Sequence, residues 1–405
     1  MGIEFIGGGV CAPKGFKASG VHCGIRKNKD KRDLALIYTD KVATAAAMYT
    51  TNLVKGSPLI VTEENIKNGC AKVVICNSGN ANTCNADGED KAHRMCEIVA
   101  KSLGIDESDV IVASTGVIGQ ILPIEPIESA AETLAGELSV GGNDNAAEAI
   151  MTTDTVKKQV AVEFQIDGKT CRIGGMAKGS GMIHPNMATM LCFITSDVKI
   201  SINCLNSVLK AVVDKTFNMV SIDGDTSTND MVSVLANGCA ENSEINGGKN
   251  LEIFKAALFK VLESLSRMIA SDGEGATHLI ECVVSGAKSW ETAKTVSKSV
   301  ICSSLMKAAI FGADANWGRV LCAIGYSGAD VDVRKIDVSF KSSAGEIAVC
   351  KNGAGIEFSE EKAKKILVEH DVSIIIGLND GNETATAWGC DLTYDYVKIN
   401  GDYRT

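Results

Sequence analysis

The sequence predicts a mixed α/β fold, because short β-type runs and amphipathic helical patterns alternate along its 405 residues. The β-type runs are rich in Val and Ile and are bounded by Gly, Asn or Asp, as strands usually are. The expected strands are 34–38, 72–76, 110–113, 160–166, 190–195, 279–284, 331–340 and 372–376. Helical spacing of apolar residues predicts helices over 90–103, 127–138, 203–217, 251–269 and 359–369. Ser359 before two glutamates is typical of a helix start, because acidic side chains favour the positive end of the helix dipole.

The length predicts two or three domains of ordinary size, or one large intertwined domain. Apolar residues make up 45% of the chain and charged residues 22%, as in globular proteins with a sizeable core. Forty basic and fifty acidic residues give a formal net charge of −10, which argues against binding to nucleic acid or to an anionic membrane surface. The sequence shows no secretory signal and no apolar run long enough to cross a bilayer, so a cytoplasmic location is expected.

The fifteen cysteines are an odd number and include no CxxC pair. Structural zinc sites need ligands that converge locally, so no metal site is expected. Most of the cysteines lie in apolar stretches, which predicts reduced packing residues in a reducing compartment. A catalytic cysteine beside one of the five histidines is the alternative. Neither a GxGxxG motif after a strand nor a GxxxxGK[ST] motif occurs, so nucleotide-loop enzymes are not supported.

Clusters of small polar residues beside glycine recur along the chain. They are 77–82, 114–119, 151–155, 177–182, 184–191, 221–230, 272–277, 314–319 and 400–405. Each cluster alone is typical of a turn, because Gly, Asn, Asp and Ser dominate turns. Glycine also lets backbone amides approach a ligand closely. Nine such clusters in one chain favour an elaborate polar pocket.

Thr189 has the chemistry of a latent nucleophile. It follows Ala188 and opens an apolar run, where the simplest interpretation is a β-branched residue that starts a strand. Cleavage of the Ala188–Thr189 bond would give Thr189 a free α-amine next to its own hydroxyl. Because an α-amine has a reference pKa near ~7.7–8.0, much of it can be neutral and can take the hydroxyl proton. The threonine would then need no histidine as its base.

The run His184-Pro-Asn-Met-Ala-Thr-Met-Leu191, with Lys178-Gly-Ser-Gly-Met182 before it, resembles the ornithine acetyltransferases of arginine biosynthesis. This family comprises glutamate N-acetyltransferases that are often bifunctional and that mature by cleaving their own Ala–Thr bond. The resemblance covers nearly the whole chain, because further blocks occur in family order. These blocks are 77–82, 114–119, 151–155, 221–230, 272–277, 314–319 and the tail that ends at Thr405.

The resemblance implies an N-terminal-nucleophile-type layered α/β fold, with Thr189 as the nucleophile of both self-cleavage and catalysis. An N→O acyl shift at Ala188–Thr189 would give an α-subunit, 1–188, and a β-subunit, 189–405, which assemble as an α2β2 heterotetramer. The hydroxyl of Thr115 and the backbone N–H of Gly116 would form the oxyanion hole. Loss of one such donor typically costs ~3 kcal/mol of transition-state stabilisation.

The resemblance also implies the substrate contacts. Lys178 would supply a cation and Glu274 an anion, which suits an α-amino acid with a cationic side chain. Thr152 and Thr153 are both retained for one contact, because the sequence does not distinguish them. The full set of implied contacts is Thr152 or Thr153, Lys178, Thr189, Glu274, Asn400 and Thr405.

The implied reaction is a ping-pong acetyl transfer. Thr189 would attack the acetyl carbonyl of N2-acetylornithine, ornithine would leave, and the α-amine of glutamate would take the acetyl group to give N-acetylglutamate. No metal or redox cofactor is expected, because a positioned base and an oxyanion hole suffice. Acetyl-CoA is a second acetyl donor in bifunctional members, and no separate nucleotide-type motif marks a site for it here.

Two other classes of protein remain open from the residues alone. A related N-terminal-nucleophile amidohydrolase or aminopeptidase would share Thr189 but release the acyl group to water. A non-catalytic glycine-rich binding protein would use Thr189 only to start a strand. The chain departs from the family pattern at Cys192, at Ala313, and at Thr83-Cys84, where a Thr-Gly pair is expected. These departures concern substrate preference and use of acetyl-CoA more than the acyl-transfer chemistry.

Overall fold

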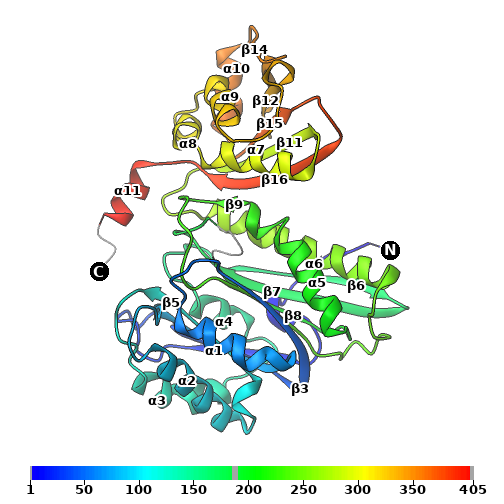
Figure 1. Ribbon diagram of the computed structural model, residues 1–405. Coiled ribbons are helices and arrows are strands. Elements are labelled where there is room, and N and C mark those ends of the chain that lie inside the picture. Colours follow the sequence, from blue (N-terminus) through cyan, green and yellow to red (C-terminus); the bar gives the residue numbers. More distant parts are fainter. Residues whose placement is uncertain (1, 185–189, 402–405) are drawn as a thin grey trace. The chain divides into compact units, whose positions relative to one another are not determined.

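The computed structural model describes residues 2–184 and 190–401 and has a mixed α/β fold, as the sequence predicts (Figure 1). The chain forms two compact units, each built from several segments. The first unit contains 1–179, 185–217 and 226–265, and the second contains 180–184, 218–225 and 266–405. Neither unit is one continuous stretch, so the two units do not coincide with the expected fragments 1–188 and 189–405.

The first unit is built on one sheet, whose path among the described residues runs β1-β6-β7-β8-β10-β3-β4-β5, with β2 also paired to β3. These strands are β1 (Glu4–Ile6), β2 (Phe16–Val21), β3 (Leu34–Tyr49), β4 (Cys70–Asn80), β5 (Val110–Val117), β6 (Lys158–Ile166), β7 (Lys169–Lys178), β8 (Leu191–Ser196) and β10 (Met231–Ala236). The helices are α1 (Ser57–Asn65), α2 (Gly88–Leu103), α3 (Glu125–Gly136), α4 (Asn143–Ala149), α5 (Ile202–Val213) and α6 (Gly248–Ser271), the last of which continues into the second unit.

Strand β3 belongs to both halves of this sheet. Its first half pairs with β2 and β4, its second half pairs with β10, and its pairing with β4 shifts register between Tyr38 and Ala43. The three residues 40–42 in between are exposed, whereas the strand on either side is mostly buried. A register shift of this kind bends a strand. One half of the sheet can therefore fold over the other.

The alternation of side chains along the strands shows how the layers stack. Val73 and Ile75 of β4 pack with α1, α2 and α3 in one core, whereas Val74 and Cys76 join a second core. That second core also takes in Leu191 and Phe193 of β8 and residues of β10, so it lies between the two halves of the sheet. On the far side of β7, Gly175 faces Leu265 and Val261 of α6. The result is a helix–sheet–sheet–helix sandwich, with α1 and α2 along the sheet in Figure 1.

The second unit has a seven-stranded sheet among its described residues, in the order β14-β13-β12-β15-β11-β16-β9. Helix α7 packs on β11 and β16. The strands are β9 (Val220–Ser221), β11 (Leu279–Ala287), β12 (Asp337–Ser342), β13 (Gly345–Lys351), β14 (Ala354–Gly355), β15 (Asp371–Gly377) and β16 (Glu383–Cys390). The helices are α7 (Trp290–Cys302), α8 (Ser304–Phe311), α9 (Trp317–Gly325), α10 (Glu360–Leu367) and α11 (Tyr394–Asn400). Short 3-10 turns occupy Gly9–Cys11, Ile66–Asn68, Glu107–Asp109, Phe217–Met219 and Val333–Lys335.

Most expected elements are confirmed, with three larger errors at their ends. The strand expected over 34–38 continues to Tyr49 as β3. The strand expected over 331–340 begins only at Asp337, because Val333–Lys335 forms a 3-10 turn whose start is held by the Asp332 side chain. The helix expected over 203–217 ends at Val213. Among the described residues, no helix is both long and apolar enough to cross a membrane.

Ser359 caps α10, as its sequence position indicates. Its side chain accepts a hydrogen bond from the Lys362 backbone N–H. We expect Ser359→Ala to lower the free energy of unfolding by about 1 kcal/mol, because a helix-terminal N–H loses its acceptor. Urea unfolding followed by circular dichroism measures this change. Ser359→Asp keeps an acceptor and should cost only a small fraction of that amount; equal losses in both variants would contradict the capping role.

Candidate active site

The predicted site residues fall into three groups in the structure. Thr115, Gly116, Thr152, Thr153 and Lys178 belong to the first unit. Glu274 and Asn400 belong to the second unit. Ala188, Thr189 and Thr405 lie outside the described residues.

The proposed oxyanion donors lie where two parallel strands end. Strands β4 and β5 run side by side in register, so Ser78 is opposite Thr115 and Gly79 is opposite Gly116. Gly116 has a φ of +135°, and a Cβ at this position would lie 2.3 Å from the backbone carbon of Gly79. Only glycine therefore fits here, and its close approach to β4 fixes the course of the backbone around residue 116.

A network of buried amide side chains holds these strand ends together. The Ser114 hydroxyl donates to the Asn77 side chain at 2.6 Å, and Asn229 Nδ2 donates to the carbonyls of Ser114 and Ala81 at 2.9 and 2.6 Å. The Thr83 hydroxyl donates to Asn229 Oδ1. Asn229 was only one member of the polar cluster 221–230 in the sequence. Its role as the link between β5 and the loop after β4 depends on contacts between distant residues, which the sequence does not reveal.

Lys178 reaches Thr115 from the opposite half of the sandwich. Lys178 ends β7 and alternates with Met176, and Thr115 alternates with Ala113 on β5, so both side chains point to the inner face where the second core lies. Lys178 Nζ donates to Thr115 Oγ1 at 3.3 Å. An ammonium group can only donate, so the Thr115 oxygen accepts and its own hydroxyl proton remains available for another acceptor. This arrangement suits a hydroxyl that stabilises a developing oxyanion.

Asp154 is a second charge at this end of the sandwich. Its side chain is buried and pairs with Lys158, whose Nζ lies 2.6 Å from Oδ1, and it also accepts the backbone N–H groups of Gly179 and Thr152. Burial alone would raise the pKa of Asp154, but Lys178, Lys158 and the Gly179 amide together lower it to about 2. The carboxylate therefore stays ionised and compensates buried positive charge. Burial lowers the pKa of Lys178, and Asp154 opposes that shift.

Asp230 is another buried acid, and its pKa is shifted in the opposite direction from that of Asp154. Burial raises the pKa of Asp230 well above its usual range, although Ser227, Lys178 and Thr50 oppose the shift. Asp230 Oδ2 has no hydrogen-bond partner within the part of the chain that the structure describes. Burial therefore favours the neutral form of Asp230. It precedes Met231, whose N–H donates to the Met190 carbonyl just before β8.

The two candidate threonines remain undistinguished. Thr152 and Thr153 are both half-buried in the loop before β6. The Thr152 backbone donates to Asp154 and accepts from Arg26 Nη2 at 3.0 Å, so this residue is fixed through its main chain. The choice between the two side chains stays open.

In the second unit, Glu274 and Asn400 are in direct contact. Asn400 Nδ2 donates to Glu274 Oε2 at 2.8 Å, and Glu274 is buried. The Glu274 backbone N–H donates to the Ser180 carbonyl at 2.8 Å. The loop that carries Glu274 is fastened by Asp391, which accepts the backbone N–H groups of Thr277 and His278. Two of the implied substrate contacts are thus adjacent.

One thiol lies beside a histidine, the alternative that the cysteine count left open. Cys302 Sγ lies 3.6 Å from His184 Nδ1, and the same nitrogen lies 3.0 Å from the Ser221 hydroxyl. Burial and the nearby Lys298 lower the pKa of His184 to about 4, so this imidazole is neutral near pH 7. A neutral imidazole gives no electrostatic help to a thiolate. The pair is therefore no activated nucleophile in this geometry.

The packing prediction is confirmed for only part of the other cysteines, because Cys84 and Cys322 are exposed. All fifteen thiols are free, and eight of these cysteines are buried. Cys192 is fully buried on β8, and burial raises the pKa of its thiol. Cys84, which stands where the family has glycine, adopts a φ of +61°, a conformation that glycine tolerates best. No group of three or more potential metal ligands comes together among the described residues.

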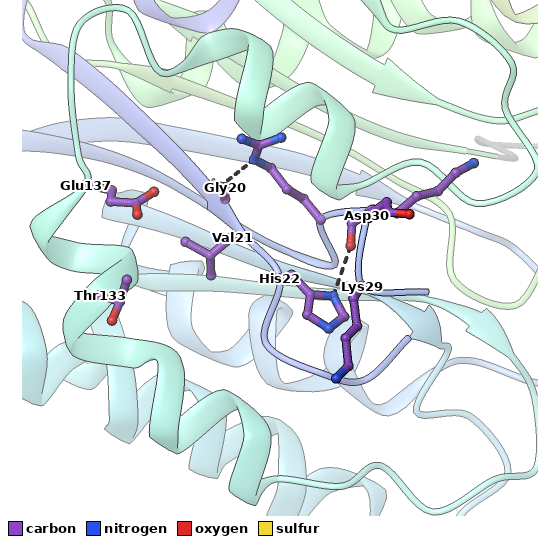
Figure 2. Close-up of a pocket in the computed structure, with 9 residues that line it drawn as sticks. Gly20, Val21, His22, Lys29, Asp30, Thr133 and Glu137 are labelled. Atoms are coloured by element: carbon purple, nitrogen blue, oxygen red, sulfur yellow. Dashed lines mark hydrogen bonds between the residues drawn. The ribbon is translucent and has the colours of Figure 1, made fainter. Parts of the chain in front are cut away.

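A separate cleft of about 430 Å³ lies away from these residues (Figure 2). It is lined by Gly20, Val21, His22, Lys29, Asp30, Lys31, Arg32, Thr133 and Glu137, which include none of the predicted site residues. Two of its charged or polar side chains are already engaged. Arg32 pairs with Glu148 and donates to the Gly20 carbonyl, and His22 contacts the Lys31 carbonyl, as the dashed lines in Figure 2 show for the last two contacts.

The geometry in the first unit defines a class of protein: a layered α/β enzyme with hydroxyl and amide donors suited to acyl transfer. Residues 17–405 match the ArgJ family. Arginine biosynthesis bifunctional protein ArgJ of Caldanaerobacter subterraneus subsp. tengcongensis is 50% identical over 405 residues, all of both chains. ArgJ 1 of Clostridium acetobutylicum is 51% identical over 392 residues, 96% of each chain.

A solved structure of arginine biosynthesis bifunctional protein ArgJ from Bacillus halodurans is 47% identical, with a TM-score of 0.50. The match covers 52% of this chain and 97% of the solved chain. The chain described here belongs to the ArgJ family. It is an acyltransferase of arginine biosynthesis, which confirms the family resemblance in the sequence.

Asp154 gives the protein a testable pH dependence. A carboxyl whose pKa falls on folding stabilises the fold above its unfolded pKa, and this contribution is lost as the pH falls through the folded pKa. With an unfolded pKa near ~3.9 and a folded pKa of about 2, Asp154 should cost the wild type about 2 kcal/mol of its free energy of unfolding as the pH falls from ~5 to ~2. Asp154→Asn should lack this loss. At pH 7 the variant should be about 3 kcal/mol less stable, because Lys158 stays buried and loses its ion pair with Asp154.

Urea unfolding of wild type and variant at a series of pH values measures the difference. The difference in the free energy of unfolding between wild type and Asp154→Asn should become smaller as the pH falls. Asp144→Asn is the control, because Asp144 is an exposed carboxyl that lies 3.5 Å from Lys157. Parallel stability curves for Asp154→Asn and wild type would show that Asp154 is not held ionised by its lysines.

Proposed function

We propose that this chain transfers the acetyl group of N2-acetylornithine to glutamate through an acetyl ester on Thr189. The observation that carries the proposal is the hydrogen bond between Lys178 and Thr115. It lies next to residue 116, where the close backbone of Gly79 permits only glycine. It supports the assignment of the Thr115 hydroxyl and the Gly116 N–H as oxyanion donors. Membership of the ArgJ family supports the substrates, because the relatives are arginine biosynthesis proteins.

In the proposed reaction, the α-amine of Thr189 takes the proton of its own hydroxyl, and Oγ1 attacks the acetyl carbonyl. The oxyanion is held by Thr115 and Gly116. When the tetrahedral intermediate collapses, the proton passes to the amine of ornithine, which leaves, and acetyl-Thr189 remains. The α-amine of glutamate then attacks this ester, and its proton returns through the Thr189 amine to Oγ1. N-acetylglutamate is released and the free threonine is restored.

The proposed substrate contacts follow the family resemblance. Lys178 supplies a buried cation for an α-carboxylate, and Glu274, oriented by Asn400, supplies an anion for an ammonium group. One of Thr152 and Thr153, together with Thr405, completes the proposed set. The reaction needs no metal or redox cofactor, and acetyl-CoA is proposed as a second acetyl donor because the relatives carry the name bifunctional.

Maturation by cleavage of the Ala188–Thr189 bond is part of the proposal. A fragment 189–405 would hold 217 of the 405 residues, and the Bacillus halodurans chain, itself 97% covered, matches 52% of this chain. That length supports a chain cut near its middle. The fragments 1–188 and 189–405 would assemble as an α2β2 heterotetramer. The fifteen free thiols support a reducing compartment, which we take to be the cytoplasm.

The nucleophile is tested by Thr189→Ala, which removes the hydroxyl that both cleavage and transfer require. Denaturing mass spectrometry should show two fragments, ending at Ala188 and beginning at Thr189, in wild type and one intact chain in the variant. Acetyl transfer from N2-acetylornithine to glutamate should fall to background. An intact, active wild-type chain would refute the mechanism. Release of free acetate in place of N-acetylglutamate would instead indicate a hydrolase.

The oxyanion role of Thr115 is tested separately on cleaved enzyme. Thr115→Val keeps the shape of the side chain but removes the hydroxyl, and we expect kcat to fall roughly 100-fold or more with little change in KM. Thr115→Ser keeps the donor and should retain most of the activity. If valine and serine have equal effects on kcat, the hydroxyl is not a transition-state donor.

A further inference from the structure

The segment 180–184 is fastened along its length to the rest of the second unit. Ser180 Oγ donates to the Asp272 carbonyl at 2.6 Å, and the Ser180 carbonyl accepts the Glu274 N–H at 2.8 Å. Gly181 packs directly on the Glu274 carboxylate, because a Cβ on Gly181 would lie 2.3 Å from Oε2. The Ile183 carbonyl accepts the Ile222 N–H at 2.7 Å. This segment ends at His184, and four residues separate it from Thr189 in the sequence.

Asp223 makes the strongest of these attachments. Its Oδ2 accepts the Met182 N–H at 2.6 Å, and its Oδ1 accepts the Ile183 N–H at 2.8 Å. A carboxylate that accepts two successive backbone amides forms charge-assisted hydrogen bonds, which are about twice as strong as neutral ones. The Asp223 carboxylate therefore fixes two consecutive peptide units.

The backbone at this point needs such an attachment. Met182 has a φ of +56°, a left-handed conformation that is unfavourable for a residue with a Cβ. Its side chain is 44% exposed, so packing of that side chain does not explain the conformation. Strained backbone of this kind persists only where the surroundings over-determine it. The two amide hydrogen bonds to Asp223 supply that constraint.

We propose that Asp223 is a positioning residue for self-cleavage, because it fixes the backbone of Met182 and Ile183, and Ile183 precedes Ala188 by five residues in the sequence. The inference rests on the proposed maturation. An N→O acyl shift forms the Thr189 Oγ1–C bond to the Ala188 carbonyl and breaks the C–N bond, with the hydroxyl proton passing to the departing nitrogen; water then hydrolyses the ester. A misplacement of about 1 Å can slow such a reaction by about 100-fold, so an anchored approach matters.

Asp223 has a second set of neighbours, which allows its roles to be separated. It accepts the Asp225 backbone N–H at 3.3 Å and faces Tyr396 of α11, the helix that carries Asn400. Burial raises the pKa of Tyr396, and the Asp223 and Glu274 carboxylates add to that rise. Tyr396→Phe removes this contact while the two amide hydrogen bonds remain. Asp225→Asn changes an exposed carboxyl in the same loop.

The experiment follows the intact chain after pulse labelling in cell-free synthesis and measures the first-order rate of cleavage on denaturing gels. We expect Asp223→Asn to slow cleavage about ten-fold or more, because an amide nitrogen replaces one of the two acceptors. Asp225→Asn and Tyr396→Phe should cleave at the wild-type rate. Asp223→Glu keeps the carboxylate on a longer side chain and should recover part of the rate.

Thermal unfolding and hydrogen exchange of the 180–184 peptide accompany the rates. Among the variants that fold, those with slower cleavage should also show less amide protection at Met182 and Ile183. If Asp223→Asn fails to fold, Asp223→Glu provides the same test. Loss of protection without slower cleavage would overturn the role of Asp223 and leave the maturation itself intact. A wild-type chain that is never cut would overturn both proposals.

Discussion

The compensation of buried charge at one end of the sandwich is the constraint on which the site depends. Lys158 is fully buried and Lys178 nearly so, and a buried ammonium is tolerated only with a partner. Asp154 is that partner, and its ion pair with Lys158 and its bond to the Gly179 amide fix the position at which β7 ends. Lys178, the last residue of β7, donates to Thr115 from this position. Removal of the acid would leave two cations buried side by side.

The layering explains why this cluster can act on a strand from the other half of the sheet. Side chains that alternate inward on β5 and β7 meet across a core that is apolar along most of its length. At the end of that core the apolar side chains give way to Thr115 and Lys178, so the same alternation that packs the sandwich also presents polar groups at its edge. Gly116 lets the end of β5 approach Gly79 of β4 there, at a spacing that no larger residue at position 116 permits.

The sequence predicts the fold class because the central strands contain strongly apolar runs, 73–76 in β4 and 110–113 in β5. Strand β7 escaped prediction because its two adjacent glycines and its charged residues weaken the β-type pattern. Thr115 and Lys178 were assigned through family resemblance, since nothing in their spacing indicates that residues 63 positions apart make contact. Asn229 and Asp223 were missed as individuals for the same reason: each acts through backbone groups of distant segments.

The strand order of the first unit has a consequence for a chain cut after residue 188. Strands β8 and β10 come from the later part of the sequence, yet they pair with β7 on one side and with β3 on the other, both from the earlier part. Strands of the later fragment are therefore inserted between strands of the earlier fragment in one sheet. Separation of the fragments would break the backbone hydrogen bonds of both pairs, β7–β8 and β3–β10. The fragments of a cut chain would therefore separate only if this unit unfolds. The two fragments would therefore unfold in one cooperative transition with heat or denaturant, and they would dissociate only when the first unit unfolds.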